Sequence, residues 1–264
     1  MFSHPITLGL HLHDEDCSEK APPNSKPTII FCSGAWHTEV HIRPIIPHFE
    51  NIGYRVVACP LPTAGQREAP SPAETIQALQ STFEAGLKSN PTIALVLHSA
   101  AGRFGTLAIN NILDKTPEAK DRIHVLYLGS SLGHVFLLEN LMGKGYIRKN
   151  HETGTVYTDN AHELFYNDMS EEDAKPFVEA LTFQISAPKP ELTSNAFEAC
   201  ELWSLCCEKD NVVPVDLQVK VAQDHNMQVV RLNTGHCPFI SKPEELVAVV
   251  DRALRSPARH MDTS

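Results

Sequence analysis

The sequence of 264 residues predicts an α/β protein with a mostly parallel central sheet, helices on both faces and a helical insertion. Three observations predict this class. Apolar runs of about five or six residues alternate with helical patterns, as in strands that are buried on both sides of a parallel sheet. The alternation stops between about residues 133 and 197 and then resumes. Polar residues follow the apolar runs directly, at the strand ends where open parallel sheets carry their functional groups.

The alternation begins after a polar connector that contains prolines, at residues 17–27. Six apolar runs are predicted strands, in chain order TIIFC (28–32), YRVVAC (54–59), TIALVL (92–97), IHVLYL (123–128), ELWSLCC (201–207) and MQVVRL (227–232). Helical patterns separate most of them, at 40–53, 73–88, 99–113, 215–224 and 243–255. Before the connector, apolar residues at every second position indicate a short edge strand, namely Ile6, Leu8, Leu10 and Leu12.

The break in the alternation defines the expected domain organisation. We expect an N-terminal extension at 1–27, a core formed by 28–132 together with 198–264, and a helical cap at 133–197 above the strand ends. Within the cap, two helical pieces meet at 168–170, where Ser170 and the acidic charge of Asp173 suit a helix start. The two strands after the cap return the chain to the same sheet, so the cap is an insertion and not a second domain.

Composition excludes several classes of partner. The net charge of −10, with Lys and Arg scattered, argues against a surface for nucleic acid or anionic membrane. No run approaches 18 uncharged apolar residues, and the first residues lack the basic start and apolar centre of a signal peptide. The seven cysteines form no C-x-x-C pair and mostly stand in apolar contexts. They therefore indicate reduced thiols and a cytoplasmic protein.

Three strand ends carry residues that can act together. Ser99 follows the strand at 92–97 at a strand-to-helix turn, Asp210 follows a later strand, and His236 follows the last. This chain order is the one that serine hydrolases of this architecture use. Taken alone, each residue also fits a plain structural role: a small residue at a turn, a turn-initiating acid and a packed loop histidine. Their joint placement in this order favours catalysis.

Each of the three would have a distinct chemical task. Ser99 would be the nucleophile, His236 its general base and later the acid for the leaving group, and Asp210 the group that fixes the histidine tautomer. The oxyanion hole would use the backbone N–H of Ala100 and that of either Ala35 or Trp36. Of the competing acids, Glu208 lies nearer the strand body, and Asp216 lies past Pro214 at a helix start.

The serine turn departs from the usual pattern G-x-S-x-G, because Leu97 and Ala101 occupy the two glycine positions. A strict motif search therefore rejects this stretch. Alanine in place of the second glycine adds one methyl group, which tightens the packing at the turn without forbidding it. We expect the elbow geometry to survive.

Several segments resemble the α/β-hydrolase superfamily, and within it small fungal serine hydrolases related to plant methylesterases and hydroxynitrile lyases. They are TIIFCSGAWH, GYRVVACPLP, LVLHSAAG, FYNDMSEEDA, CEKDNVVP and GHCPFISKPEEL, spread over nearly everything from residue 28 onward. The resemblance implies a Ser99–Asp210–His236 triad, a helical cap, and no cofactor or metal. Two departures stand out: Ser33 precedes Gly34 where relatives carry His-Gly, and Cys237 replaces the lysine that assists cyanide release in the lyases. Cyanogenic lyase chemistry is therefore not expected.

The leading hypothesis is a serine hydrolase that cleaves an ester or lactone of a small apolar molecule in secondary metabolism. The residues expected to face this substrate are Trp36, His37, Phe136, Leu137, Tyr146, Phe165, Tyr166 and Phe177. A second hypothesis keeps the triad but ends in acyl-enzyme cyclisation, C–C cleavage or lyase chemistry. A third is a small-ligand receptor without turnover. No nucleic acid or membrane partner is expected, and the oligomeric state stays open.

Overall fold

The structure is a computed structural model that describes residues 26–66, 70–132, 137–185, 190–192 and 195–255. The predicted edge strand at 6–12 and the candidate residue Phe136 lie outside the described residues. Among the described helices, none is both long enough and apolar enough to cross a bilayer.

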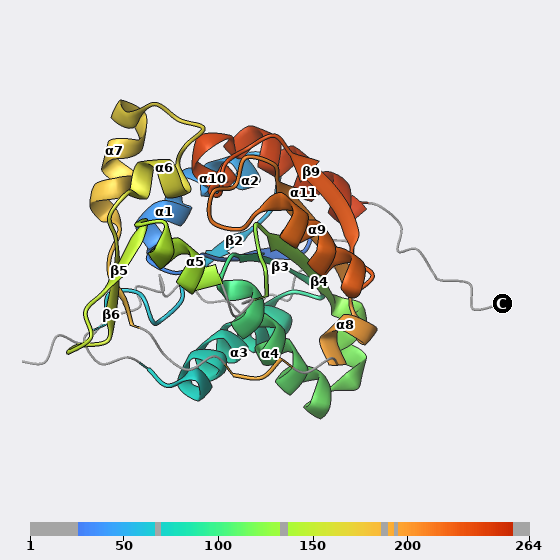
Figure 1. Cartoon of the computed structure of the whole chain (residues 1–264). Helices are drawn as coiled ribbons and strands as arrows, with labels where there is room; N and C mark the ends of the chain where they lie inside the picture. Colours follow the sequence, from blue (N-terminus) through green and yellow to red (C-terminus); the bar gives the residue numbers. More distant parts are fainter. Residues whose placement is uncertain (1–25, 67–69, 133–136, 186–189, 193–194, 256–264) are drawn as a thin grey trace, which may run out of the picture.

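A six-stranded parallel sheet forms the centre of the molecule, in the order β2-β1-β3-β4-β8-β9 (Figure 1). The strands are β1 (Thr28–Cys32), β2 (Val56–Ala58), β3 (Ile93–His98), β4 (Ile123–Leu128), β8 (Glu201–Cys207) and β9 (Gln228–Leu232). All six predicted strands and their parallel pairing are confirmed. The chain leaves β1 in one direction along the sheet and returns past it to β3, so the topological switch point lies between β1 and β3. Ligands bind at such points in open α/β sheets.

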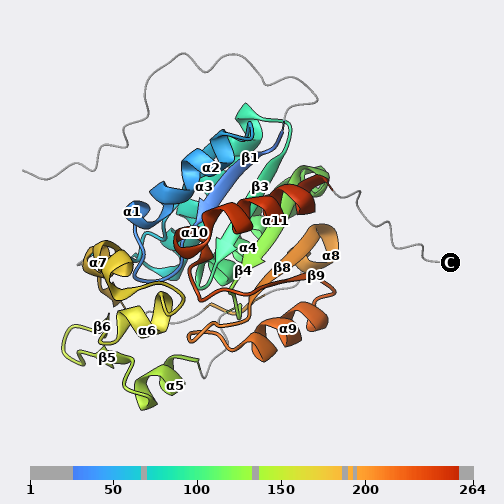
Figure 2. The ribbon, with the colours of Figure 1, turned by 90° about the horizontal axis from the view of Figure 1, so that it is seen from above.

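Helices cover both faces of this sheet. On one face lie α3 (Pro72–Ser89) and α4 (Ala101–Lys115), and on the other α2 (Ile46–Glu50) and α11 (Pro243–Arg255), as Figures 1 and 2 show. Alternate residues of β3 serve the two cores, with Val96 facing α2 and α11 and Leu95 facing α3 and α4. Side chains of opposite faces are buried along the whole of β3, which explains its uninterrupted apolar sequence.

The remaining core helices are short or follow the last strands. They are α1 (Glu39–Ile42), α9 (Val215–Asp224) and α10 (Pro238–Ser241), with 3-10 turns at Arg43–Ile45 and Pro117–Arg122. The helix expected over 40–53 is divided into α1, a 3-10 turn and α2. Pro44 and Pro47 fall within it, and proline lacks the N–H that a continuous helix needs.

The region between β4 and β8 holds more than the predicted helices. The expected pair of helical pieces is present as α6 (Ala161–Phe165) and α7 (Glu171–Ala180), with the Ser170 hydroxyl capping α7. It also contains α5 (Leu137–Gly143), α8 (Asn195–Ala199) and an antiparallel sheet of β5 (Ile147–Lys149), β6 (Thr155–Thr158) and β7 (Gln184–Ile185). These strands are two to four residues long, too short to produce a readable alternation.

The elements of the predicted cap do not all lie together. In Figure 2, α5, α6, α7, β5 and β6 gather beside one end of the central sheet, and α8 lies apart from them. The backbone N–H of Ala196 in α8 donates to Asn110 Oδ1 of α4 at 2.7 Å. This last part of the region at 133–197 therefore packs on a core helix.

Candidate functional site

Ser99 stands directly after β3 in a backbone conformation that non-glycine residues rarely adopt, with φ of +52°. Its N–H donates to the Leu128 carbonyl at 2.9 Å, which continues the ladder between β3 and β4. Its carbonyl accepts the N–H of Gly102 at 3.0 Å and the hydroxyl of Ser130 at 2.8 Å. Such strain costs of order 1–3 kcal/mol and persists only where surrounding contacts fix it. The sharp turn expected for a nucleophile is present.

Glycines inside α4 explain how this turn forms without its usual glycines. A Cβ added to Gly105 would lie 2.7 Å from both Cδ atoms of Leu97, so the absence of a side chain there makes room for this leucine. A Cβ added to Gly102 would collide with the Ser130 hydroxyl that holds the Ser99 carbonyl. The close approach between strand and helix thus depends on positions one and four residues after Ala101.

Asp210 and His236 form a buried pair, with 2.8 Å between Asp210 Oδ2 and His236 Nδ1. The Asp210 Oδ1 accepts the backbone N–H groups of Val212 and Val213, each at 2.8 Å. Gln218 Nε2 donates to Asp210 Oδ2 at 3.1 Å. A carboxylate only accepts hydrogen bonds, so the proton of neutral His236 lies on Nδ1 and its Nε2 keeps a free lone pair. This is the protonation state that a general base requires.

Gln218 is a supporting residue that sequence reasoning missed. It lies on α9, is fully buried and also accepts the Cys207 N–H at 2.9 Å. Its amide therefore anchors the carboxylate to the end of β8. A glutamine inside an amphipathic helix gives no signal of this role in the sequence.

The loop that carries His236, which we call the histidine loop (Asn233–Cys237), is fastened to the segment between α6 and α7. Asp168 Oδ2 accepts the N–H of Gly235 and the hydroxyl of Ser241, both at 2.8 Å. A Cβ on Gly235 would lie 2.7 Å from Asp168 Oδ1, so glycine is required at this close approach. The sequence predicts 168–170 only as a junction between helices, and its contact with the histidine loop was missed.

The segment after β1, which we call the oxyanion loop (Ser33–Trp36), lies against Ser99. A Cβ on Gly34 would stand 2.7 Å from Ser99 Cβ and 3.2 Å from Ser99 Oγ. Gly34 thus allows a close approach between this loop and Ser99, with Ser33 at the position where relatives carry histidine.

The backbone and the indole of Trp36 already have hydrogen-bond partners. Its φ is +65°, and its N–H points to Gln184 Oε1 at 3.4 Å. Its carbonyl accepts the Thr182 N–H at 3.1 Å, and its indole N–H donates to the Val156 carbonyl at 3.0 Å, so residues of the cap bind its N–H, its carbonyl and its indole. In the described part of the chain, the N–H groups of Ala35 and Ala100 donate to no protein acceptor. Of the two alternatives that the sequence leaves open, Ala35 is therefore the one whose N–H has no protein acceptor in the described residues.

The three predicted catalytic residues follow β3, β8 and β9, whose carboxyl ends lie at the same edge of the parallel sheet, with β4 between β3 and β8. Gly129, which follows the Leu128 bonded to Ser99, would bring a Cβ to 3.2 Å from Asp210 Oδ2 and 3.4 Å from His236 Nδ1. Within the described ranges, the hydrogen bonds of His236 run to Asp210 and His98, and none joins its ring to Ser99 Oγ. Nucleophile–base bonds are often loose without substrate and tighten in the reactive complex.

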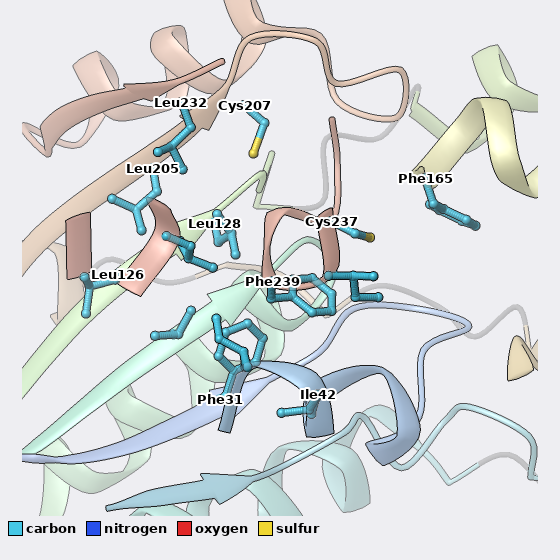
Figure 3. Packing of buried hydrophobic residues seen from close by; sticks show 14 of the residues in the cluster. Phe31, Ile42, Leu126, Leu128, Phe165, Leu205, Cys207, Leu232, Cys237 and Phe239 are labelled. Atoms are coloured by element: carbon cyan, nitrogen blue, oxygen red, sulfur yellow. The ribbon is translucent and has the colours of Figure 1, made fainter. Parts of the chain in front are cut away.

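Four residues expected to face substrate are buried, at 5% exposure or less, in this conformation: Trp36, His37, Phe165 and Tyr166. His37 Nδ1 is 2.7 Å from the Ala35 carbonyl, and Tyr166 Oη is 3.1 Å from His37 Nε2. Burial and the neighbouring His41 lower the pKa of His37, and burial raises that of Tyr166, so Tyr166 donates to a neutral His37. Figure 3 shows Phe165 extending from α6, apart from the other labelled side chains and on the side of Cys237 and Phe239.

Among the residues expected to face substrate, Phe165 has a ring that contacts the His236 ring. Its ring centroid lies 5.9 Å from that of His236 and 5.7 Å from that of Trp36. Tyr146 instead donates to Glu163 Oε1 at 2.8 Å, and Phe177 packs on His41. Leu137 is partly buried against the same core.

A separate cavity of about 410 Å³ lies beside the small antiparallel sheet. Its walls include Arg148, Tyr157, Val178, Leu181 and Phe183. No predicted catalytic or oxyanion residue lines it. In the described ranges, no group of three or more His, Cys, Asp or Glu side chains is arranged to hold a metal ion.

Fold and geometry together define an α/β protein with a serine in a strained strand-to-helix turn and a buried acid–histidine pair at the carboxyl ends of its strands. Residues 29–249 match the model of the alpha/beta hydrolase family, and the chain belongs to this family. The resemblance stated from the sequence is thereby confirmed.

Two curated fungal proteins are similar over most of the chain. "Probable hydrolase R7" of Phoma sp. is 29% identical, covering 86% of this chain and 97% of the relative. "Alpha/beta hydrolase nvfD" of Aspergillus novofumigatus is 23% identical, covering 86% and 96%.

Solved structures share the fold. A pyrethroid hydrolase from Sphingobium faniae superposes with a TM-score of 0.70 at 20% identity, covering 88% of this chain and 98% of that one. Polyneuridine aldehyde esterase superposes with a TM-score of 0.67 at 16% identity, covering 86% and 99%. At these identities the likeness concerns the fold.

Proposed function

We propose that this protein is a serine hydrolase that cleaves an ester or lactone of a small apolar molecule through an acyl-enzyme on Ser99. One observation carries the proposal: the ring of a buried histidine whose Nδ1 is held by Asp210 lies 4.6 Å from the ring of His98, which directly precedes a serine in a strained turn. Strain of this kind is retained where the surrounding contacts enforce it, and it clusters at active sites. The names of the fungal relatives and of the esterase with the same fold agree with hydrolysis.

In the proposed reaction, His236 transfers a proton both when the acyl-enzyme forms and when water cleaves it. The Ser99 oxygen attacks the carbonyl carbon while its proton passes to His236 Nε2. The negative charge on the carbonyl oxygen is stabilised by the Ala35 and Ala100 N–H groups and by the N-terminus of α4, which begins at Ala101. The C–O bond breaks, and His236 returns the proton to the leaving alcohol. Water, deprotonated by His236, then attacks the acyl-enzyme and releases the acid and free Ser99.

The preference for an apolar substrate follows from the residues around the histidine. Trp36 and Phe165 form a tilted aromatic pair on the cap side of His236. We propose that these two rings form part of the wall of the acyl or alcohol pocket.

A fluorophosphonate probe and a panel of short p-nitrophenyl esters and lactones test this function. Wild type should be labelled and should hydrolyse at least one ester or lactone, and Ser99→Ala should lose both. Ser81→Ala is a matched control, because Ser81 is an exposed serine on α3 that bonds only within its helix. Absence of labelling in folded wild type contradicts the proposed nucleophile. Labelling of Ser99 with no turnover contradicts the hydrolytic step alone.

A further inference from the structure

The residue directly before the nucleophile, His98, is fully buried at the centre of the site. Its Nδ1 accepts the N–H of Gly34 in the oxyanion loop at 3.1 Å. Its Nε2 lies 3.1 Å from the backbone carbonyl of His236. One side chain therefore touches the oxyanion loop and the histidine loop while its own backbone leads into Ser99.

These two hydrogen bonds determine the protonation state and the tautomer of the His98 imidazole. A backbone N–H only donates, so Nδ1 must carry a lone pair, and a carbonyl only accepts, so Nε2 must carry the proton. Only neutral His98 in the Nε2–H form satisfies both partners. Burial, with His236 and His37 close by, lowers its pKa well below the usual value, so this form persists when His236 is protonated during the reaction.

Ring contacts restrict the position of His98 further. The His98 ring lies 4.6 Å from the His236 ring and 4.9 Å from the Phe239 ring, measured between centroids. A Cβ on Gly34 would stand 2.7 Å from Ser99 Cβ, so Gly34 lies close to Ser99 and a shift of the oxyanion loop changes its distance from the Ser99 side chain. The histidine loop is held in a similar way, because His98 Nε2 bonds the backbone carbonyl of His236, the proposed base.

We propose that His98 is a positioning residue that sets the distance of both the oxyanion hole and the base His236 from Ser99. This inference rests on the proposed hydrolase function and adds to it a residue that touches neither substrate nor proton. It acts through Gly34 on one side and through the His236 backbone on the other.

A second buried histidine separates this role from ordinary core packing. His41 also accepts a backbone N–H at Nδ1, from Thr38 at 3.0 Å, and its Nε2 lies 3.0 Å from the Phe177 carbonyl. The hydrogen-bonding pattern is the same, but it joins α1 to α7 and contacts none of the triad. His41→Asn is therefore the matched control for the loss of a satisfied buried imidazole.

Two substitutions remove one contact of His98 at a time. In His98→Asn the amide oxygen stands where Nδ1 was and can accept the Gly34 N–H, but nothing reaches the His236 carbonyl. In His98→Gln the amide nitrogen stands where Nε2 was and can donate to that carbonyl, but the Gly34 N–H loses its acceptor. Each variant is compared with wild type and His41→Asn for folding, kcat and KM on the best ester. The affinity ratio of a trifluoromethyl ketone to its methyl ketone counterpart is also measured.

We expect kcat to fall about 10- to 100-fold in both variants, less than the roughly 10²–10³ that loss of an oxyanion donor costs, with KM within about threefold. The ketone affinity ratio should fall most in His98→Gln, because its oxyanion loop is released. His41→Asn should lose stability but keep kcat and the ratio within about threefold. Folded His98 variants with wild-type kcat and ratio, or equal losses in His41→Asn, overturn the proposal.

Nitrogen NMR on the wild type, with histidine labelled by ¹⁵N, decides the matter even if both variants fail to fold. We expect the ring assigned to His98 to stay in the neutral Nε2–H form throughout the pH range of activity, a form that the contacts of His41 also favour, and an Nδ1–H form or a charged ring at His98 overturns the proposal. A failure of the proposed hydrolase function can be distinguished from a failure of the His98 proposal, because it appears as absence of Ser99 labelling in wild type. If wild type is labelled and the His98 results are negative, only this inference fails.

Discussion

Replacing Asp210 with asparagine is a substitution whose consequence the geometry of the site dictates. The Oδ1 position faces two backbone donors, the N–H groups of Val212 and Val213, each 2.8 Å away. These donors cannot change, so the asparagine oxygen must take this position. The amide NH₂ then takes the Oδ2 position, where it meets His236 Nδ1 at 2.8 Å and Gln218 Nε2 at 3.1 Å.

His236 can relieve the resulting contact between donors only by moving its proton to Nε2. Its Nδ1 then accepts from the amide, and Nε2 can no longer take the proton of Ser99. The opposite amide orientation is worse, because it sets NH₂ against two fixed N–H donors. A triad acid changed to its amide lowers kcat by about 10⁴, and we expect a loss of that order for Asp210→Asn, with little change in KM. Gln218 Nε2 keeps the Val213 and Cys207 carbonyls as acceptors at 2.7 and 3.3 Å, and the loss of its hydrogen bond to the carboxylate should cost about 1–3 kcal/mol of unfolding free energy.

Steady-state kinetics on a p-nitrophenyl ester, the rate of fluorophosphonate labelling and urea unfolding measure these effects together. Glu208→Gln is the control, because Glu208 lies two residues earlier, is 39% exposed and pairs only loosely with Arg231 at 3.6 Å. It should retain activity within about twofold, as exposed ion pairs contribute little. A folded Asp210→Asn protein with more than a tenth of wild-type activity would refute the assignment of Asp210 and the tautomer argument.

Three further predictions follow from close approaches and burial. Gly34→Ala brings a Cβ to 2.7 Å from Ser99 Cβ, so we expect about 10-fold or greater loss of kcat in a protein destabilised by about 1–3 kcal/mol; wild-type kcat contradicts this. Gly105→Ala should cost about 1–3 kcal/mol in urea unfolding through its clash with Leu97, and a double-mutant cycle with Leu97→Ala should show coupling of about 1 kcal/mol or more; additive effects contradict it. Burial lowers the pKa of His37, His41 and His98, and that of the less buried His225, below the unfolded value of about 6.5. The unfolded state therefore binds more protons below about pH 6.5, and stability should be full above that pH and fall below it. The slope is up to about 1.4 kcal/mol per pH unit for each histidine, and a urea midpoint that does not change between pH 7 and pH 5.5 contradicts it.

Much of the core could be predicted from the sequence because its strands are buried on both faces. Such strands are uninterrupted apolar runs, so β3 and β4 could be located almost to the residue. The cap strands β5 and β6 could not, because they are short, partly exposed and joined by a turn at Gly154 with φ of +70°. Their place in the fold depends on contacts with Trp36 that are distant in sequence.

The candidate site also contains residues that could be predicted from the sequence and residues that could not. Ser99, Asp210 and His236 could be predicted because each follows a strand and the order of strand ends is readable. The residues that orient them could not, because Gln218 lies in an amphipathic helix and His98 belongs to an apolar strand. The missing glycines at 97 and 101 also misled a strict motif search, because the small residues needed for strand–helix contact are Gly102 and Gly105.

The covalent step on Ser99 is the central claim, and rapid-quench intact-mass spectrometry with a hydrolysed ester tests it directly. We expect a transient species heavier than the protein by one acyl group, carried by the peptide that contains Ser99 and absent from Ser99→Ala. Turnover of the ester without such a species in wild type, together with an active Ser99→Ala protein, would contradict the account. So would an acyl group carried by any other residue on the path to product.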